Sequence, residues 1–155
     1  MKNKTVVALS AAVAVIVLCL TITLFIVNYR TVPGMENTKL QVVVFSHMED
    51  SVICCDNGVS LDLDDKFNKV FDREGFLSAV SEGEQFFVRV SPKQLDDTVY
   101  TPYAIIGDGG EYLSLEQTIA CYNESNATAA IGLAVGILVF VALAGISVFL
   151  FYHKD

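Results

Sequence analysis

The cysteines of the central segment are the side chains with the greatest capacity for chemistry. In an oxidising compartment, Cys121 could form a disulfide with Cys54 or with Cys55. Only one member of the adjacent pair can face Cys121, because neighbouring strand residues point to opposite faces of a sheet. Buried, reduced thiols are the leading alternative. A metal site that adds His47 is a weaker hypothesis, because the paired Cys-x-x-Cys spacing of structural zinc is missing.

The remaining polar residues form no recognisable catalytic or cofactor-binding pattern. His47 is the only histidine between the two apolar ends, so a Ser, His and acid set is not available, and no phosphate-binding glycine-rich loop is present. Grouped aspartates could hold a hard cation, but the Gly and Glu of an EF-hand loop are missing, and solvated charge is the better interpretation. These aspartates are Asp62, Asp64, Asp65, Asp96 and Asp97. We therefore expect no cofactor, no metal and no catalytic residue, and we expect that the protein is not an enzyme.

Two long apolar runs enclose the central segment. Residues 5–28 and 127–152 contain no charged side chain, and as helices they would extend about 36 and 39 Å, against about 30 Å for the bilayer core. Both are predicted to cross the membrane with some tilt. A cleavable signal peptide is the alternative for the first run, but its apolar stretch exceeds the roughly 7–15 residues of such peptides. A segment of about 98 residues is also too small to cover two helices that are apolar on all sides.

Charge indicates the orientation of the chain and limits its partners. Lys2, Lys4 and Lys154 lie on one side of the predicted spans, whereas Arg30 and Lys39 lie on the other. We therefore predict a multi-pass protein of the cell membrane with both termini cytoplasmic and the central domain extracytoplasmic. Residues 31–126 contain six Lys or Arg and 17 Asp or Glu, a formal charge of −11. This acidic domain disfavours binding to nucleic acid and to anionic lipid headgroups, but it permits a basic protein partner.

The pattern of the central segment predicts a small α+β domain of mainly antiparallel strands. Apolar runs of strand length predict strands at 40–46, 51–55 and 99–106, and period-two alternation predicts strands at 59–64 and 85–91, with Pro102 suited to a sheet edge. The sequence Asp56-Asn57-Gly58 predicts a tight turn. Asp72 is a candidate N-cap for a helix with Phe76, Leu77 and Val80 on one face, which ends at Gly83. An OB-like barrel and an open sheet with one packed helix are the two architectures that fit this order.

These signals divide the chain into seven parts. Pro33 and Gly34 interrupt any helix that leaves the first span, and Ser114 with Gln117 forms a capping box that opens a helix. The predicted parts are a cytoplasmic N-terminus 1–4, transmembrane helix 5–28, linker 29–38, β-rich domain 39–113, juxtamembrane helix 114–126, transmembrane helix 127–152 and cytoplasmic tail 153–155.

Short motifs in this layout resemble a known type of protein. These motifs are Gly83-Glu84, the run from Tyr112 to Gln117, and Tyr122-Asn123 just before the final apolar run. With an amino-terminal anchor, they are similar to a recurrent type of uncharacterised small bacterial membrane protein in which two transmembrane helices flank a small OB-like β domain. The resemblance implies a bacterial source and the same two-span architecture, and it carries no known activity or catalytic residue.

Small residues in the two spans predict close helix packing. Gly132 and Gly136 form a Gly-x-x-x-Gly pair, and Ala8 and Ala12 offer similar spacing in the first run. Packing of the two spans within one chain is the simplest use, and a homodimer through Gly132 and Gly136 is the alternative. Apart from Cys19, neither span contains an ionisable side chain that could line a path for protons or ions.

The function that fits these features is an interaction module. A two-span anchor would present a small β domain outside the cytoplasmic membrane, where the domain binds a protein partner or ligand. One alternative is a thiol-based redox protein or another envelope enzyme that uses Cys54, Cys55 and Cys121. Another is an accessory subunit of a membrane transport complex, which would need a partner to supply polar groups inside the membrane.

Overall fold

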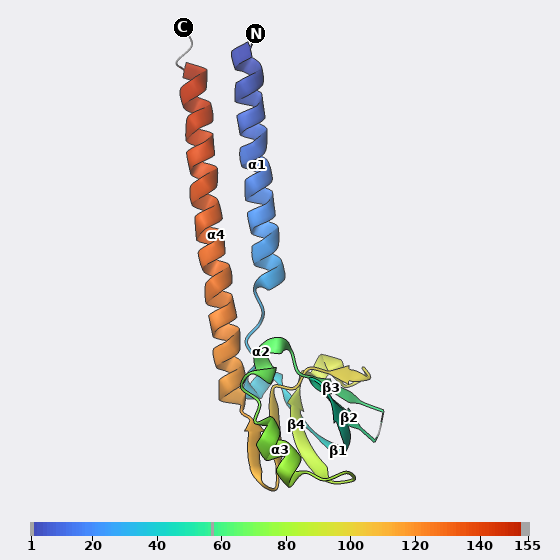
Figure 1. Ribbon diagram of the computed structural model, residues 1–155. Coiled ribbons are helices and arrows are strands. Elements are labelled where there is room, and N and C mark those ends of the chain that lie inside the picture. The colour runs from blue at the N-terminus through green and yellow to red at the C-terminus, as the bar shows by residue number, and fades with distance from the viewer. Residues whose placement is uncertain (1, 57, 153–155) are drawn as a thin grey trace. The chain divides into compact units, whose positions relative to one another are not determined.

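A computed structural model describes residues 2–56 and 58–152, which divide into two compact units (Figure 1). The helix-pair unit comprises the chain up to Arg30 and from Glu124 onward. The sheet unit comprises Thr31–Asn123, so it includes most of the predicted linker and the first turns of the last helix.

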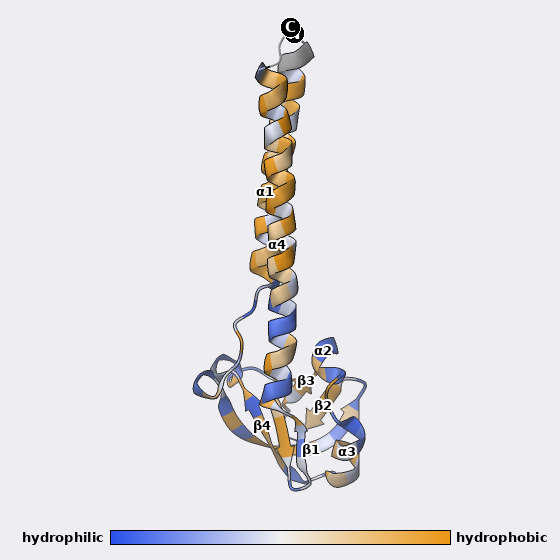
Figure 2. Cartoon of the chain, turned by 90° about the vertical axis from the view of Figure 1, so that its left-hand side faces the viewer, coloured by the Kyte–Doolittle hydropathy of each residue, from blue (hydrophilic) through white to orange (hydrophobic). Residues whose placement is uncertain are grey.

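The helix-pair unit is built from α1, Lys2–Asn28, and from the later part of α4, Leu115–Tyr152. Both helices are long and apolar enough to cross a membrane (Figure 2). Only 6% of the most apolar stretch of each helix is buried. The predicted juxtamembrane helix and second span form one continuous helix. Residues 115–131 contain neither Gly nor Pro, so no residue in that stretch ends the helix.

The sheet unit contains seven strands in the order β5-β3-β2-β1-β4-β6-β7. Every neighbouring pair is antiparallel except β3 and β5, which are parallel. The strands are β1 Lys39–Glu49, β2 Val52–Cys55, β3 Ser60–Asp62, β4 Gln85–Val90, β5 Val99–Tyr100, β6 Ala104–Gly107 and β7 Gly110–Leu113. The short helical segments of this unit are η1 Met35–Asn37, α2 Asp65–Asn68, α3 Arg73–Ala79 and η2 Pro92–Gln94.

Of the two architectures that fit the sequence, the open sheet is the one observed, and the closed OB-like barrel is wrong, because β5 and β7 form the two edges of the sheet. The long strand β1 pairs with β4 along its first half and with β2 along its second half, with a bulge between Phe45 and His47. The predicted strand 99–106 is divided into β5 and β6 around Pro102, which has no N–H to donate to a ladder. A two-residue edge strand offers too few hydrogen bonds to close a barrel.

The inner face of the sheet forms the core, with α3 packed against it (Figure 1). Phe76 of α3 is fully buried, and its ring makes edge-to-face contacts with Phe45, Phe86 and Tyr112 at centroid distances of 5.3, 5.3 and 5.4 Å. The predicted alternation of β4 is confirmed, because Phe86, Val88 and Val90 are all fully buried. One aromatic side chain therefore joins three strands to the helix that covers them.

Local capping signals are confirmed at both predicted helix starts. The Asp72 carboxylate accepts a hydrogen bond from the Gly75 backbone N–H at 3.0 Å. Ser114 and Gln117 form a reciprocal capping box, in which each side chain accepts from the other residue's N–H at 3.0 and 2.9 Å.

Two further local predictions have different outcomes. In the predicted turn after β2, Gly58 has a φ of 77°, whereas Asn57 lies outside the described residues. The placement of Leu77 on the buried face of α3 is wrong, because Leu77 is 46% exposed. A helix of two turns buries Phe76, and the next residue is rotated by about 100° away from the sheet.

Replacement of Phe76 by Ala should remove the centre of the core. We expect the free energy of unfolding to fall by about 3–5 kcal/mol, because the large cavity cannot be refilled by the surrounding strands. The matched control is Leu77→Ala on the same helix, which should cost less than about 0.5 kcal/mol. Urea unfolding of the full chain in detergent, followed by the circular dichroism of the sheet unit, would measure both. Equal losses for the two variants would contradict this account of the core.

Candidate functional site

The three cysteines of the sheet unit occupy separate environments, and all are free thiols. Cys54 and Cys55 are neighbours on β2 and face opposite sides of the sheet: Cys55 lies in the core, whereas Cys54 is half-buried and pairs across the ladder with His47. Cys121 lies at the start of α4, where its thiol is 3.9 Å from the Lys66 carbonyl oxygen. The structure therefore contains none of the candidate disulfides, and each thiol has its own surroundings.

The buried Cys55 is poorly suited to nucleophilic chemistry. Burial, with smaller contributions from the neighbouring Cys54 and Asp56, raises the pKa of the Cys55 thiol to about 12. Because the thiolate is the reactive form, a thiol with this pKa remains protonated and unreactive at neutral pH.

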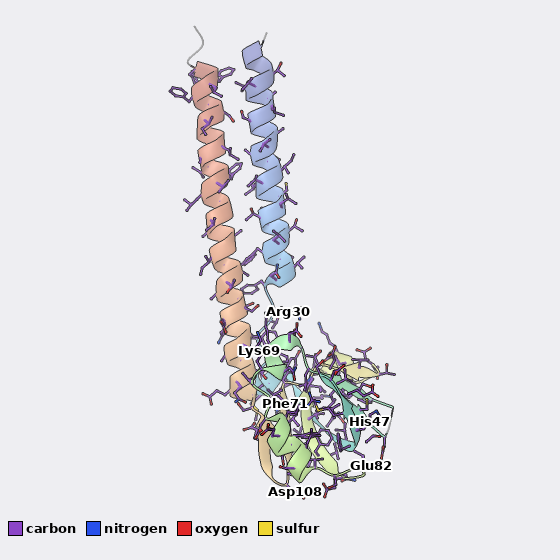
Figure 3. All side chains as sticks on the ribbon, in the orientation of Figure 1. Arg30, His47, Lys69, Phe71, Glu82 and Asp108 are labelled. Carbon is purple, nitrogen blue, oxygen red and sulfur yellow. The ribbon has the colours of Figure 1, made fainter. Side chains whose placement is uncertain are left out.

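His47 lies on the outside of the sheet unit (Figure 3). Its side chain is 57% exposed. Its Nε2 atom is 3.4 Å from a carboxylate oxygen of Glu49, and its Nδ1 atom is 3.2 Å from the hydroxyl of Ser46. In the part of the chain that the structure describes, no three His, Cys, Asp or Glu side chains come together as a metal site. Of the grouped aspartates, Asp64 caps α2 by accepting from the Lys66 N–H.

The most distinctive surface of the sheet unit is an apolar patch on the outer face of the sheet. We call it the outer strip, and it consists of Leu40, Val42 and Val44 on β1, Phe87 on β4 and Ile106 on β6. Leu40, Val42 and Phe87 are 47%, 50% and 42% exposed, although Val43 beside Val42, and Phe86 and Val88 on either side of Phe87, lie in the core. The outer strip is contiguous, because Val42 pairs with Phe87 and Phe87 pairs with Ile106 across adjacent strands.

Sequence reasoning missed this surface, although one signal pointed to it. Residues 42–45 are four consecutive apolar residues, which places apolar side chains on both faces of β1. A strand with two apolar faces is usually covered on both, and here α3 and the core cover only the inner one.

Within the helix-pair unit, small and hydroxyl-bearing residues let α1 and α4 approach closely. A Cβ atom at Gly136 would collide with the Thr21 side chain, whereas Gly132 has open space around its Cα. The Ser147 hydroxyl donates to the Ser10 hydroxyl at 2.8 Å, and Ala14 is buried. Of the predicted packing residues, Gly136 thus lies at the helix contact, whereas Ala8, Ala12 and Gly132 lie on exposed sides.

A polar clamp joins the two helices where α1 ends. The side-chain amide of Asn126 accepts a hydrogen bond from the Arg30 backbone N–H at 3.0 Å and donates one to the Arg30 carbonyl at 2.8 Å. Asn126 is 8% exposed, so both its donor and its acceptor are used inside the contact. The two helices are therefore held by hydrogen bonds at this clamp and at the serine pair.

The raised pKa of Cys55 predicts a loss of stability in alkali. The unfolded thiol ionises near pH 9.0 and the folded thiol near 12, so the folded state keeps a proton that the unfolded state loses. The stabilisation is complete below pH 9.0 and declines as the pH rises toward 12. Urea unfolding between pH 7.5 and 10.5 should show a steeper decline for the wild type than for Cys55→Ala, with Cys54→Ala as control. Parallel curves for wild type and Cys55→Ala would contradict the burial of a neutral thiol.

The helix contact predicts that two glycines four residues apart respond differently to Ala. Gly136→Ala should weaken the pair by about 1–3 kcal/mol, because its methyl group must displace the branched Thr21 side chain. Gly132→Ala should be neutral in the monomer. Reversible unfolding in mixed micelles, read by energy transfer between dyes on the two helices, measures the difference. A loss at Gly132 that equals the loss at Gly136 would instead indicate that both glycines lie in a helix contact.

Comparison with known proteins found no relative with which this geometry can be compared. The chain matches no protein-family model, no curated protein and no solved structure at a significant level.

Proposed function

We propose that the chain is a membrane-anchored interaction module, whose sheet unit binds a protein partner through the outer strip. In this proposal, α1 and α4 cross the cell membrane as a pair and hold the sheet unit outside the cytoplasm. The observation that carries the binding function is the contiguous, exposed apolar surface of Leu40, Val42 and Phe87 on a domain that is otherwise strongly acidic.

The membrane location is supported by the apolar surface that the helix pair leaves uncovered. Large apolar side chains on every side of α1 and α4 are exposed, and Ala14 is the only buried apolar residue that the structure describes within the helix-pair unit. Exposure to water costs roughly 25 cal/mol for each Å² of apolar surface, so a bilayer is the environment that removes this cost for two helices of sufficient length. The hydroxyls of Ser10, Thr21 and Ser147 are bonded within the pair, as a lipid environment requires.

The proposed orientation of the chain in the membrane follows from the basic residues that flank the two helices. Lys2, Lys4 and Lys154 favour cytoplasmic termini, which leaves the acidic sheet unit outside the cytoplasm. A bacterial source is part of this proposal and has the resemblance to small bacterial membrane proteins as its support.

A binding role for the outer strip is supported by its contiguity. Single exposed apolar side chains are normal on protein surfaces, but a contiguous apolar patch rimmed by polar residues is typical of an interaction site. The strip includes the exposed aromatic ring of Phe87, and aromatic residues commonly dominate the energy of protein interfaces. A thiol-based redox role has less support, because the high pKa of Cys55 disfavours its thiolate.

Site-specific photo-crosslinking in the cells that make the protein would test the proposed function. With a photoreactive amino acid in place of Val42, we expect a covalent adduct to one protein of defined mass. The matched control places the same amino acid at Leu77, which is similarly exposed on α3, and should give no such adduct. Adding Phe87→Ser should reduce the yield of the adduct at position 42 by at least tenfold, because the aromatic ring of Phe87 is lost from the interface.

The other outcomes of this experiment would count against the proposal. Adducts to lipid alone at position 42 would assign the strip to the membrane surface. The absence of any protein adduct at position 42, or equal adducts at positions 42 and 77, would overturn the binding role of the strip.

A further inference from the structure

The dimensions of the outer strip match those of one α-helix. The strip extends from β1 across β4 to β6, which is two strand spacings, or about 10 Å. An α-helix with its side chains is about 10–12 Å wide. Along β1, the strip runs from Leu40 to Val44, about 13 Å, which corresponds to roughly nine helical residues. A helix that lies along β4 can therefore cover the strip with one apolar face.

Exposed carboxylates border the strip on its two long sides. On one side, Glu111 of β7 pairs with Ile106 across the ladder. On the other side, Asp56 directly follows β2, and its backbone N–H donates to the Val44 carbonyl at 3.1 Å. Strands β2 and β7 are four strand spacings apart, so the two carboxylates lie about 19 Å from each other with the strip between them. A helix on the strip would have one acidic residue along each flank.

The two ends of the strip differ in charge. Arg89 lies beside Leu40 in the ladder, and its Nη1 atom donates to the Thr38 hydroxyl at 3.2 Å. Asp56 instead borders Val44 at the opposite end, and Glu111 borders Ile106, which lies level with Val42 in the middle of the strip. Cations on a bound helix would therefore be favourable near the Val44 end and unfavourable near the Leu40 end.

From this arrangement we infer that the partner presents a cationic amphipathic helix, whose apolar face covers the outer strip and whose flanking Lys or Arg residues meet Asp56 and Glu111. The inference rests on the proposed function and specifies the chemistry of the partner. A second copy of this chain fits less well, because two domains of formal charge −11 repel each other. The addition of a strand would use a sheet edge, whereas the strip lies on a face.

Selection from a random peptide library would test this inference without assuming a sequence. The bait is the full chain in nanodiscs of zwitterionic lipid, and the library displays random peptides of about 18 residues, long enough for five helical turns. Peptides that bind empty nanodiscs are removed. We expect the enriched peptides to have apolar residues at i, i+3, i+4 and i+7 with Lys or Arg beside that face, and to become helical when bound.

Variants of the bait then locate the site. Phe87→Ser should weaken the binding of the enriched peptides by about tenfold or more. The double variant Asp56→Asn, Glu111→Gln should weaken their binding severalfold and reduce the salt dependence of that binding. Leu77→Ser is the matched control and should bind as the wild type does. Unchanged thermal unfolding of each variant would show that the sheet unit remains folded.

The possible results separate this inference from the proposed function. Enriched peptides that need Phe87 but are extended, or that carry no cations, would overturn the inference and leave the interaction role of the strip intact. Binding that needs Asp56 and Glu111 but not Phe87 would show that the peptides are held by charge attraction alone, which would also overturn the inference. A selection in which no peptide depends on Phe87 would count against both the inference and the proposed use of the strip.

Discussion

The removal of apolar surface from water is the constraint on which this structure depends. The described residues form three apolar surfaces, and the chain covers only one of them itself, the inner face of the sheet under α3. The outside of the helix pair and the outer strip remain exposed. Because each uncovered surface costs free energy in water, each implies something outside the chain that covers it. We assign a bilayer to the outside of the helix pair and a partner helix to the outer strip.

The two faces of the same strands illustrate the difference between structure and function. On β4, Val88 is fully buried in the core, whereas the adjacent Phe87 is exposed on the outer face. The inner side chain is explained by folding, because Phe76 and its neighbours surround it with apolar contacts. The outer side chain is 42% exposed, so folding removes only part of its apolar surface from water, and binding would remove the rest. The same reasoning separates Cys55, which is a core residue, from Cys54 on the outer side.

Local features of the fold could be predicted from the sequence, and features that depend on distant pairing could not. The capping residues Asp72 and Ser114 each accept a hydrogen bond from an N–H group three residues away, so the sequence alone was sufficient. The alternation in β4 was equally local. Barrel closure depends on whether the edges β5 and β7 meet, and no local pattern determines this. The packing of Gly136 but not Gly132 depends on the line along which α1 meets α4. Partly buried positions of α4 recur at 129, 133, 136 and 140, one residue away from Gly132.

The outer strip could not be predicted from the sequence for a related reason. The apolar run in β1 was correctly predicted as a strand, but a sequence cannot tell whether a second layer covers its outer face. Only the positions of α3 and of the strand neighbours show that Val42, Phe87 and Ile106 form one row on the outer face, where Val42 and Phe87 are exposed and Ile106 is half-buried.

Fluorescence quenching on the reconstituted full chain tests most directly whether the two uncovered apolar surfaces lie in different environments. A small fluorescent amino acid is placed at Ile131 of α4 or at Val42 of β1, both exposed in the structure, and is exposed to iodide in water or to a quencher attached to lipid chains. We expect the probe at position 131 to be quenched from the lipid and protected from iodide, and the probe at position 42 to be quenched by iodide and protected from the lipid quencher. Iodide quenching at position 131, or lipid quenching at position 42, would contradict this expectation.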